Sequence, residues 1–205
     1  TRFGNLGNIL DFDNLTEENI YVLESPILTN SKFKKFKNFF KKKIKVIDCT
    51  FDINSSLKDR IEKIRDESET AVREGSNNLI LSDKKINTSR ASIPSVLAVG
   101  AIHSHLVKLG IRGYCSINVE SSDILDTHSF AVLIGVGATT VNPYLAIESI
   151  YERFQKKLFS NLDFETCVSK FKKSIDDGLL KIMSKMGISV ISSYRGGCNF
   201  EAVGL

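Results

Sequence analysis

Apolar and polar residues alternate along residues 44–205 in a pattern that predicts parallel strands joined by helices. Short, largely β-branched apolar runs, which are typical of buried strands, occur at 44–52, 77–83, 114–121, 138–143 and 187–194. Segments with apolar residues at helical spacing lie between them, at 57–75, 92–110, 127–137, 144–157 and about 163–186. Most strand–helix units are roughly 30 residues long, which is what parallel crossover connections require.

Local signals set the expected helix ends. Gly75, Gly110 and Gly187 are expected to end their helices, because glycine adopts the left-handed backbone conformation that follows many helices. Ser92 is the expected N-cap of the second helix, with Pro94 in its first turn.

The number of units decides the fold class. A closed (β/α)8 barrel usually needs about 250 residues, so five or six units in 205 residues are too few. We therefore predict an α/β fold of parallel βα repeats that form an incomplete or degenerate TIM-barrel-like domain. Residues 1–43 are predicted to be an irregular N-terminal segment with a Lys/Phe-rich helix, and residues 44–205 the βα-repeat core.

Residues 32–45 carry eight lysines and no acidic residue, and Phe33, Phe36 and Phe40 recur there at helical spacing. Such a segment can bind nucleic acid or another anionic surface, because lysines contact phosphates and aromatic rings stack on bases. It can equally be an amphipathic helix with phenylalanines in the core and lysines in solvent. A net charge of +4 is small for a dedicated nucleic-acid-binding protein, which favours the second interpretation.

Composition excludes several other classes. No apolar run reaches the roughly 20 residues of a membrane span, and the first residues lack the layout of a signal peptide. The four cysteines, Cys49, Cys115, Cys167 and Cys198, are far apart and form no CxxC, so neither a zinc site nor an iron–sulfur motif is expected. Scattered thiols fit a reducing compartment.

The three histidines do not form a metal motif. His103 and His105 are two positions apart on a predicted helix, so their side chains diverge, and His128 has no carboxylate at a ligand-like spacing. We expect all three to be structural or interface residues.

Acidic residues lie near the expected carboxyl ends of the strands, where βα folds usually bind ligands. They are Asp48, Asp52, Asp83, Glu120 and Asp126. Asp83 and Glu120 are of most interest because each follows its strand directly. The alternative is that these carboxylates cap helices or bind loop amides.

Residues 187–197 present a strand-like run followed by Arg195, Gly196 and Gly197. A phosphate cradle needs a strand, then glycines, then a helix N-terminus, with Arg195 as a possible anion partner. Neither GxGxxG nor GxxxxGK[ST] is present, so a scaffold role is favoured.

Four blocks of this chain resemble the large subunit of glutamate synthase, in its central domain. They are "ESPILTN" (24–30), "NNLILSDK" with "IPSVLAVGAIHSHLVKLGIR" (77–112), "VESSDILDTHSFAVLIGVGATTVNPYLAIESI" (119–150) and "LLKIMSKMGISVISSYRGG" with "FEAVGL" (179–205). The blocks occur in the family's order and cover nearly the whole chain. Ser104 and Ser129 stand where that family usually has histidine, which is a further reason to expect structural histidines.

The resemblance implies a fragment of a multidomain enzyme that makes two glutamates from glutamine and 2-oxoglutarate. In that family an amidotransferase domain releases ammonia, which travels through a tunnel to a barrel carrying FMN and a [3Fe–4S] cluster. Electrons come from NAD(P)H, through a small NAD(P)H-oxidising subunit, or from ferredoxin. The expected location is the cytoplasm, or the plastid stroma in a photosynthetic eukaryote.

The resemblance therefore predicts a non-catalytic connecting domain without a bound cofactor or metal, inactive alone, whose partners are the amidotransferase and FMN-binding domains of the same polypeptide. The candidate residues for the domain seam or the ammonia passage are Ser82, Asp83, Glu120, Asn142 and Arg195. The alternative function is a stand-alone βα protein that binds anions or nucleic acid through the lysine-rich segment. No membrane partner is expected under either interpretation.

Overall fold

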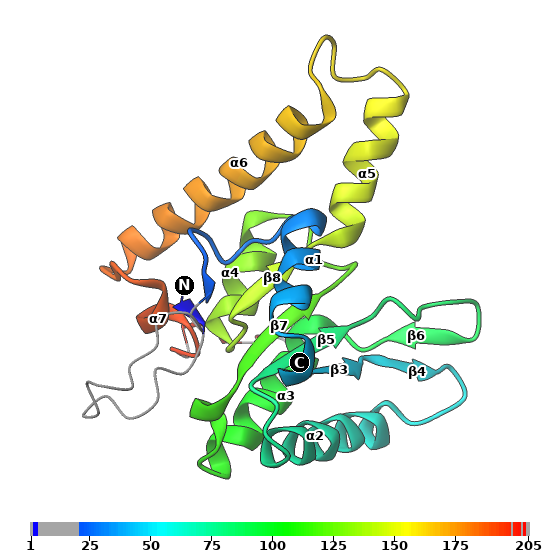
Figure 1. The fold of residues 1–205 in the computed structure, drawn as a ribbon, viewed down its shortest axis with the longest axis vertical. Helices are drawn as coiled ribbons and strands as arrows, with labels where there is room; N and C mark the ends of the chain where they lie inside the picture. The colour runs from blue at the N-terminus through cyan, green and yellow to red at the C-terminus, as the bar shows by residue number, and fades with distance from the viewer. Residues whose placement is uncertain (1, 4–20, 198, 202, 204–205) are drawn as a thin grey trace.

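The computed structural model describes residues 2–3, 21–197, 199–201 and 203. Its centre is a parallel sheet with the strand order β3-β5-β7-β8 (Figure 1). These strands are β3 (Ile44–Asp48), β5 (Asn78–Ser82), β7 (Ser116–Glu120) and β8 (Thr140–Asn142). The predicted α/β fold of parallel βα repeats is thus confirmed, and the strands in the described part of the chain do not close into a barrel.

One face of the sheet is covered by helices. They are α2 (Leu57–Arg73), α3 (Ser95–Lys108) and α4 (Thr127–Gly135), with α6 (Phe164–Lys185) behind α4. Alternate strand residues such as Leu79, Leu81, Ile117 and Val119 point into this core and are almost completely buried. Helix α5 (Tyr144–Gln155) pairs with α6, and Figure 1 shows the two helices projecting beyond the sheet.

The opposite face of the sheet packs against the N-terminal part of the chain. Ile80 of β5 joins a second apolar cluster with Phe33, Phe36 and Phe40 from α1 (Asn30–Phe39) and its C-cap. The short strands β1 (Arg2–Phe3) and β2 (Tyr21–Val22) pair antiparallel, and Phe3 and Leu23 belong to this cluster. The prediction that the phenylalanines of the lysine-rich segment face the core is therefore confirmed. The boundary between residues 43 and 44 stays a prediction.

Two predictions about the elements that border the sheet were wrong. The strand expected at 44–52 is two strands, because β4 (Thr50–Asp52) leaves the parallel sheet and pairs antiparallel with β6 (Arg90–Ser92). Ser92 is therefore occupied as the strand partner of Thr50 and does not cap α3. Asp123, in the loop after β7, accepts hydrogen bonds from Ser95 N and Oγ at 2.9 and 2.8 Å instead.

The prediction of a fifth strand at residues 187–194 was also wrong. Gly187 has φ +69° and ends α6 as predicted, while Ile188 N donates back to Met183 O at 2.9 Å. The chain then forms the short helix α7 (Ile191–Tyr194), which buries Tyr194 in the core. The sheet edge is already occupied, because Val141 N donates to Pro26 O and Leu28 N donates to Val141 O at 2.9 and 2.8 Å. Two 3-10 turns, Lys41–Lys43 and Arg112–Tyr114, complete the described elements.

Candidate interdomain site at the carboxyl ends of the strands

The last residues of the four parallel strands form one polar row across the sheet. Asp48 pairs with Ser82, Ser82 with Glu120, and Glu120 with Asn142 in the strand register. Residues in register on parallel strands point to the same face, so these four side chains lie on the side of the sheet that α1 covers. The structure thus brings three of the five predicted candidates together: Ser82, Glu120 and Asn142.

Glu120 is the centre of the row and is only 4% exposed. Ser82 Oγ donates to its Oε2 at 2.8 Å, and its Oε1 lies 3.1 Å from both Lys37 Nζ and Lys84 Nζ. Burial alone would raise the pKa of Glu120, but the Ser82 hydrogen bond and the two lysines hold the pKa below its usual value. Glu120 is therefore a buried, ionised and fully paired carboxylate at neutral pH.

The two lysines that pair with Glu120 were missed at the sequence level. Lys84 follows Ser82 and Asp83 directly, so its proximity to the strand ends gave a weak signal. Lys37 comes from α1, and nothing in its local pattern separates it from the other lysines of residues 32–45. Only the packing of α1 on the sheet selects it.

Asn142 connects the sheet to the start of α1. Its Nδ2 donates to Leu28 O and to Asn30 Oδ1, both at 2.9 Å. The side chain is 1% exposed, so its role within the described chain is to fix the N-terminal segment over the strand ends.

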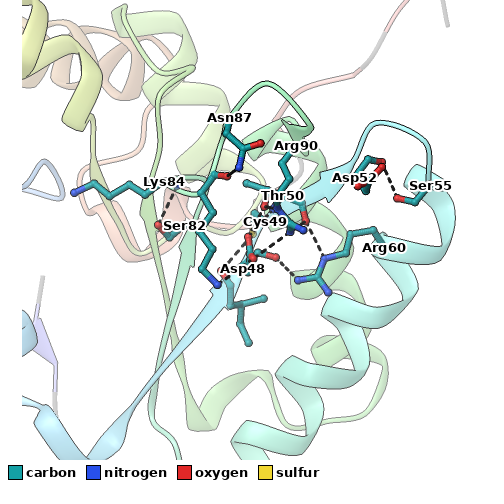
Figure 2. A network of polar contacts seen from close by, with 12 residues as sticks. Asp48, Cys49, Thr50, Asp52, Ser55, Arg60, Ser82, Lys84, Asn87 and Arg90 are labelled. Atoms are coloured by element: carbon teal, nitrogen blue, oxygen red, sulfur yellow. Dashed lines mark hydrogen bonds and ion pairs between the residues drawn. The ribbon is translucent and has the colours of Figure 1, made fainter.

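Asp48 organises the other end of the row, as Figure 2 shows. Its Oδ1 accepts from Thr50 N and Oγ1 at 3.0 and 2.7 Å, and its Oδ2 lies 3.2 Å from Arg90 Nη2 and 3.3 Å from Lys85 Nζ. Burial opposes ionisation, but the Thr50 hydrogen bonds and Lys85 lower the pKa of Asp48 overall.

Arg60 and Arg90 stabilise the bend where β3 becomes β4 (Figure 2). Arg60 Nε donates to Thr50 O at 3.1 Å, its Nη2 donates to Asp48 O, and its Nη1 pairs with Glu67 at 2.9 Å. Arg90 Nε donates to Thr50 Oγ1 at 2.9 Å. The bend is thus fixed by cations from α2 and β6.

Asp83 lies just beyond the row and is 4% exposed. Its Oδ2 accepts from Ser122 N at 2.8 Å, from Ser122 Oγ at 2.7 Å and from Ser121 Oγ at 3.3 Å. Asp83 Oδ2 thus binds groups of the loop after β7, which is the alternative expected for these carboxylates from the sequence. Asp126 likewise caps α4 by accepting from Ser129 N at 2.8 Å.

Arg195 is not part of this site. Gly196, next to it, lies against His103, and His103 Nδ1 accepts from Arg112 Nε at 3.0 Å. Arg112 also donates to Cys115 O and Gly137 O, which precede β7 and β8, so this cluster lies at the amino ends of the strands. Burial and the charge of Arg112 lower the pKa of Arg195. The strand–glycine–helix order that a phosphate cradle needs is also missing, because α7 precedes Gly196.

The histidines have partners within the fold. His105 Nε2 lies 2.9 Å from Glu69 Oε2, which joins α3 to α2, and the ring of His128 packs edge-on against Phe200. Burial and Arg112 lower the pKa of His103. Within the described residues, no three His, Cys, Asp or Glu side chains are grouped so that they could hold a metal ion.

The cysteines do not fit an iron–sulfur cluster either. Three cysteines are buried free thiols: Cys49 lies between β3 and β4, Cys115 directly precedes β7, and Cys167 is in α6. Cys198 lies outside the described residues. Burial raises the pKa of Cys49 to about 12, so this thiol stays protonated. None of the described helices has the length and apolar composition of a membrane span.

Comparison with known proteins identifies the family. A model described as the glutamate synthase central domain matches residues 1–205. The chain belongs to the glutamate synthase central domain family. It is 52% identical over its full length to the glutamate synthase [NADPH] large chain of Azospirillum brasilense, and 40% identical over 89% of its length to a ferredoxin-dependent glutamate synthase of Oryza sativa subsp. japonica. It spans only 14% and 12% of the length of these relatives.

Two solved structures share part of this fold. A dihydroorotate dehydrogenase from Eimeria tenella in complex with ferulenol has a TM-score of 0.50 and 16% identity, covering 77% of this chain and 38% of that chain. A flavocytochrome b2 variant with sulfite bound has a TM-score of 0.50 and 15% identity, covering 87% and 57%. At this identity the likeness shows the fold alone. Family membership over the whole chain favours the central-domain prediction over the alternative of a stand-alone anion- or nucleic-acid-binding protein.

Proposed function

We propose that this chain is the non-catalytic connecting domain of an enzyme that converts glutamine and 2-oxoglutarate into two glutamates. Two facts support the proposal: the family match over residues 1–205, and the small share of its relatives' length that the chain spans. The amidotransferase and FMN-binding domains of the same polypeptide are then its neighbours. FMN, the [3Fe–4S] cluster and the contact with an NAD(P)H-oxidising subunit or ferredoxin belong to those other parts. The cytoplasm or the plastid stroma stays the predicted location.

The observation that carries the proposal is the polar row at the carboxyl ends of the strands. In parallel βα folds this end is where ligands and partner groups are usually bound. Here it holds Ser82, Glu120 and Asn142 in register, with Asp83 one residue beyond. We place the seam between the two catalytic domains, and the passage of ammonia between them, at Ser82 and Asp83. Lys84 and Lys85 follow on the same edge, with side chains that are 49% and 72% exposed.

Arg195–Gly197 has a different proposed role. Because Arg195 lies at the amino ends of the strands, we place it in a turn against the flavin barrel and not in the ammonia passage. Micromolar binding of phosphate or FMN to the 205-residue chain would contradict this placement.

The test of the passage is the coupling between the two half-reactions in the complete enzyme. Ser82→Ala and Asp83→Ala are expected to raise the ratio of glutamine hydrolysed to 2-oxoglutarate consumed severalfold, because ammonia leaks where the edge is disturbed. Ser184→Ala and Asp177→Ala make the same chemical changes at exposed positions on α6 and should leave the ratio unchanged. Tight coupling in both edge variants would remove the support for the passage.

A further inference from the structure

Asp83 has one carboxylate oxygen that the fold does not use. Its Oδ2 accepts three hydrogen bonds, whereas its Oδ1 is completely buried and has no hydrogen-bond partner. Buried polar atoms in folded proteins are almost always paired, with protein groups or with a small bound molecule. An unpaired oxygen of a carboxylate is therefore a sign that something binds there.

A small cavity lies beside Asp83 on the α3 side of the sheet. Its volume is about 10 Å³, which is the space of a single water-sized molecule. The lining consists of apolar side chains, including Val119 and Ala98, together with Asp83, Ser95, Glu120, Ser121 and Cys49. The cavity is too small for any larger ligand.

The hydrogens of the polar side chains around the cavity already take part in hydrogen bonds within the protein. Ser95 Oγ donates to Asp123 Oδ1 at 2.8 Å, and the hydroxyl of Ser121 is directed to Asp123 or Asp83. The thiol of Cys49 donates to Ile47 O at 3.8 Å. The side chains therefore offer lone pairs but no further hydrogens, so a ligand has to donate hydrogen bonds and not accept them.

The charge around the cavity is negative. Among the described residues, neither Asp83 nor Asp123 takes part in an ion pair, while the nearby Lys37 and Lys84 are both held by Glu120. Tyr144 also lies near Asp83: burial, the charge of Asp83 and a hydrogen-bonding contact with Asp83 raise the pKa of Tyr144. In the described part of the chain, no hydrogen-bond partner lies within reach of Asp83 Oδ1 itself. The cavity thus favours a positively charged donor over a neutral one.

We propose that this cavity binds one ammonium ion, with Asp83 Oδ1 as the main acceptor and the hydroxyl oxygens of Ser95 and Ser121 beside it. Ammonium has the size of water, four N–H donors and a positive charge, whereas water has two donors and no charge. The ammonium proposal assigns a ligand to the site at the carboxyl ends of the strands, and it rests on the proposed function of that site.

The test is hydrogen–deuterium exchange of the complete polypeptide, read at the peptide that contains Ser122, whose amide donates to Asp83 Oδ2. Ammonium chloride is compared with potassium chloride at equal ionic strength and pH. Binding slows exchange by the factor 1 + [L]/Kd, so we expect about tenfold slower exchange at ten times the Kd. Asp83→Asn should abolish the slowing by ammonium, because the asparagine can turn an amide donor toward the cavity. Asp177→Asn on α6 is the control and should retain the slowing.

Val119→Ile is a second variant, which adds a methyl group at the cavity wall and leaves residue 83 unchanged. It should also abolish the effect. Equal slowing by potassium, slowing that survives Asp83→Asn, or no slowing by either salt would overturn the proposal; the last result would mean that the cavity holds only water. Because the measurement needs neither glutamine nor 2-oxoglutarate, a failure to bind ammonium is distinguishable from a failure of coupling.

Discussion

Phe36→Ala is expected to lower the free energy of unfolding of the 205-residue chain by about 3–5 kcal/mol. Phe36 is 0% exposed and packs against Phe3, Tyr21, Phe33 and Phe40 with ring centroids 5.1–6.2 Å apart. Its removal leaves a cavity between α1 and the face of the sheet on which Ile80 lies. Urea unfolding followed by circular dichroism measures the loss.

Phe39→Ala is the matched control, because Phe39 is on the same helix but 48% exposed. Its removal should lower the free energy of unfolding by about 1 kcal/mol or less, through the loss of its ring contacts with Tyr21 and Phe40. Equal losses in the two variants would mean that α1 does not cover the sheet in the way described.

Gly137→Ala is expected to destabilise the chain by about 2–5 kcal/mol, the sum of backbone strain and overpacking. Gly137 has φ +129°, and a Cβ there would lie 2.4 Å from His103 Nδ1. The ring cannot easily move aside, because Arg112 donates to the same nitrogen while also bonding Cys115 O and Gly137 O. Thermal or urea unfolding reports the change.

Two further variants separate the clash from a general effect of replacing glycine. Gly100→Ala, in the middle of α3 with nothing within 4 Å of the added Cβ, should stabilise the chain by about 0.5–1 kcal/mol. Adding His103→Ala to Gly137→Ala should recover more than about 1 kcal/mol relative to the sum of the single changes. A neutral Gly137→Ala would show that the His103–Arg112 contact is not rigid.

The parts of the fold that the sequence predicted are those set by local chemistry. β-branched apolar runs gave β5, β7 and β8 within about two residues, because such side chains fit a buried parallel strand wherever they occur. Gly187, with its positive φ, ended α6 as expected. The phenylalanine spacing of residues 33–40 likewise predicted which side of α1 is buried.

The parts that were missed depend on which distant segments meet. Ile188, Val190 and Ile191 have strand-forming side chains, yet Pro26–Leu28 occupies the sheet edge beyond β8. Asp123 reaches the start of α3 from a loop 28 residues away along the chain, so no local capping pattern could reveal it. Local propensity does not encode such competition between partners.

The sequence predicted only part of the candidate site. The strand pattern places Ser82, Glu120 and Asn142 at strand ends, and the parallel topology places those ends on one edge of the sheet. Their exact register, and the choice of Lys37 and Lys84 as partners of Glu120, do not. Arg195 is separated from them because α7 replaced the expected strand.

We propose that the carboxyl ends of the strands face other domains of a longer polypeptide. Lys85 and Lys156 allow a direct test, since both are exposed in this chain, at 72% and 62%, and each pairs with one carboxylate. Lys85 belongs to the strand-end loop after β5, while Lys156 lies at the far end of α5.

The decisive measurement is lysine acylation of the complete polypeptide, read by mass spectrometry at these two positions. If the strand ends form a seam between domains, Lys85 is acylated severalfold more slowly than Lys156. Equal rates at the two lysines would mean that the strand ends face solvent, and would contradict the account.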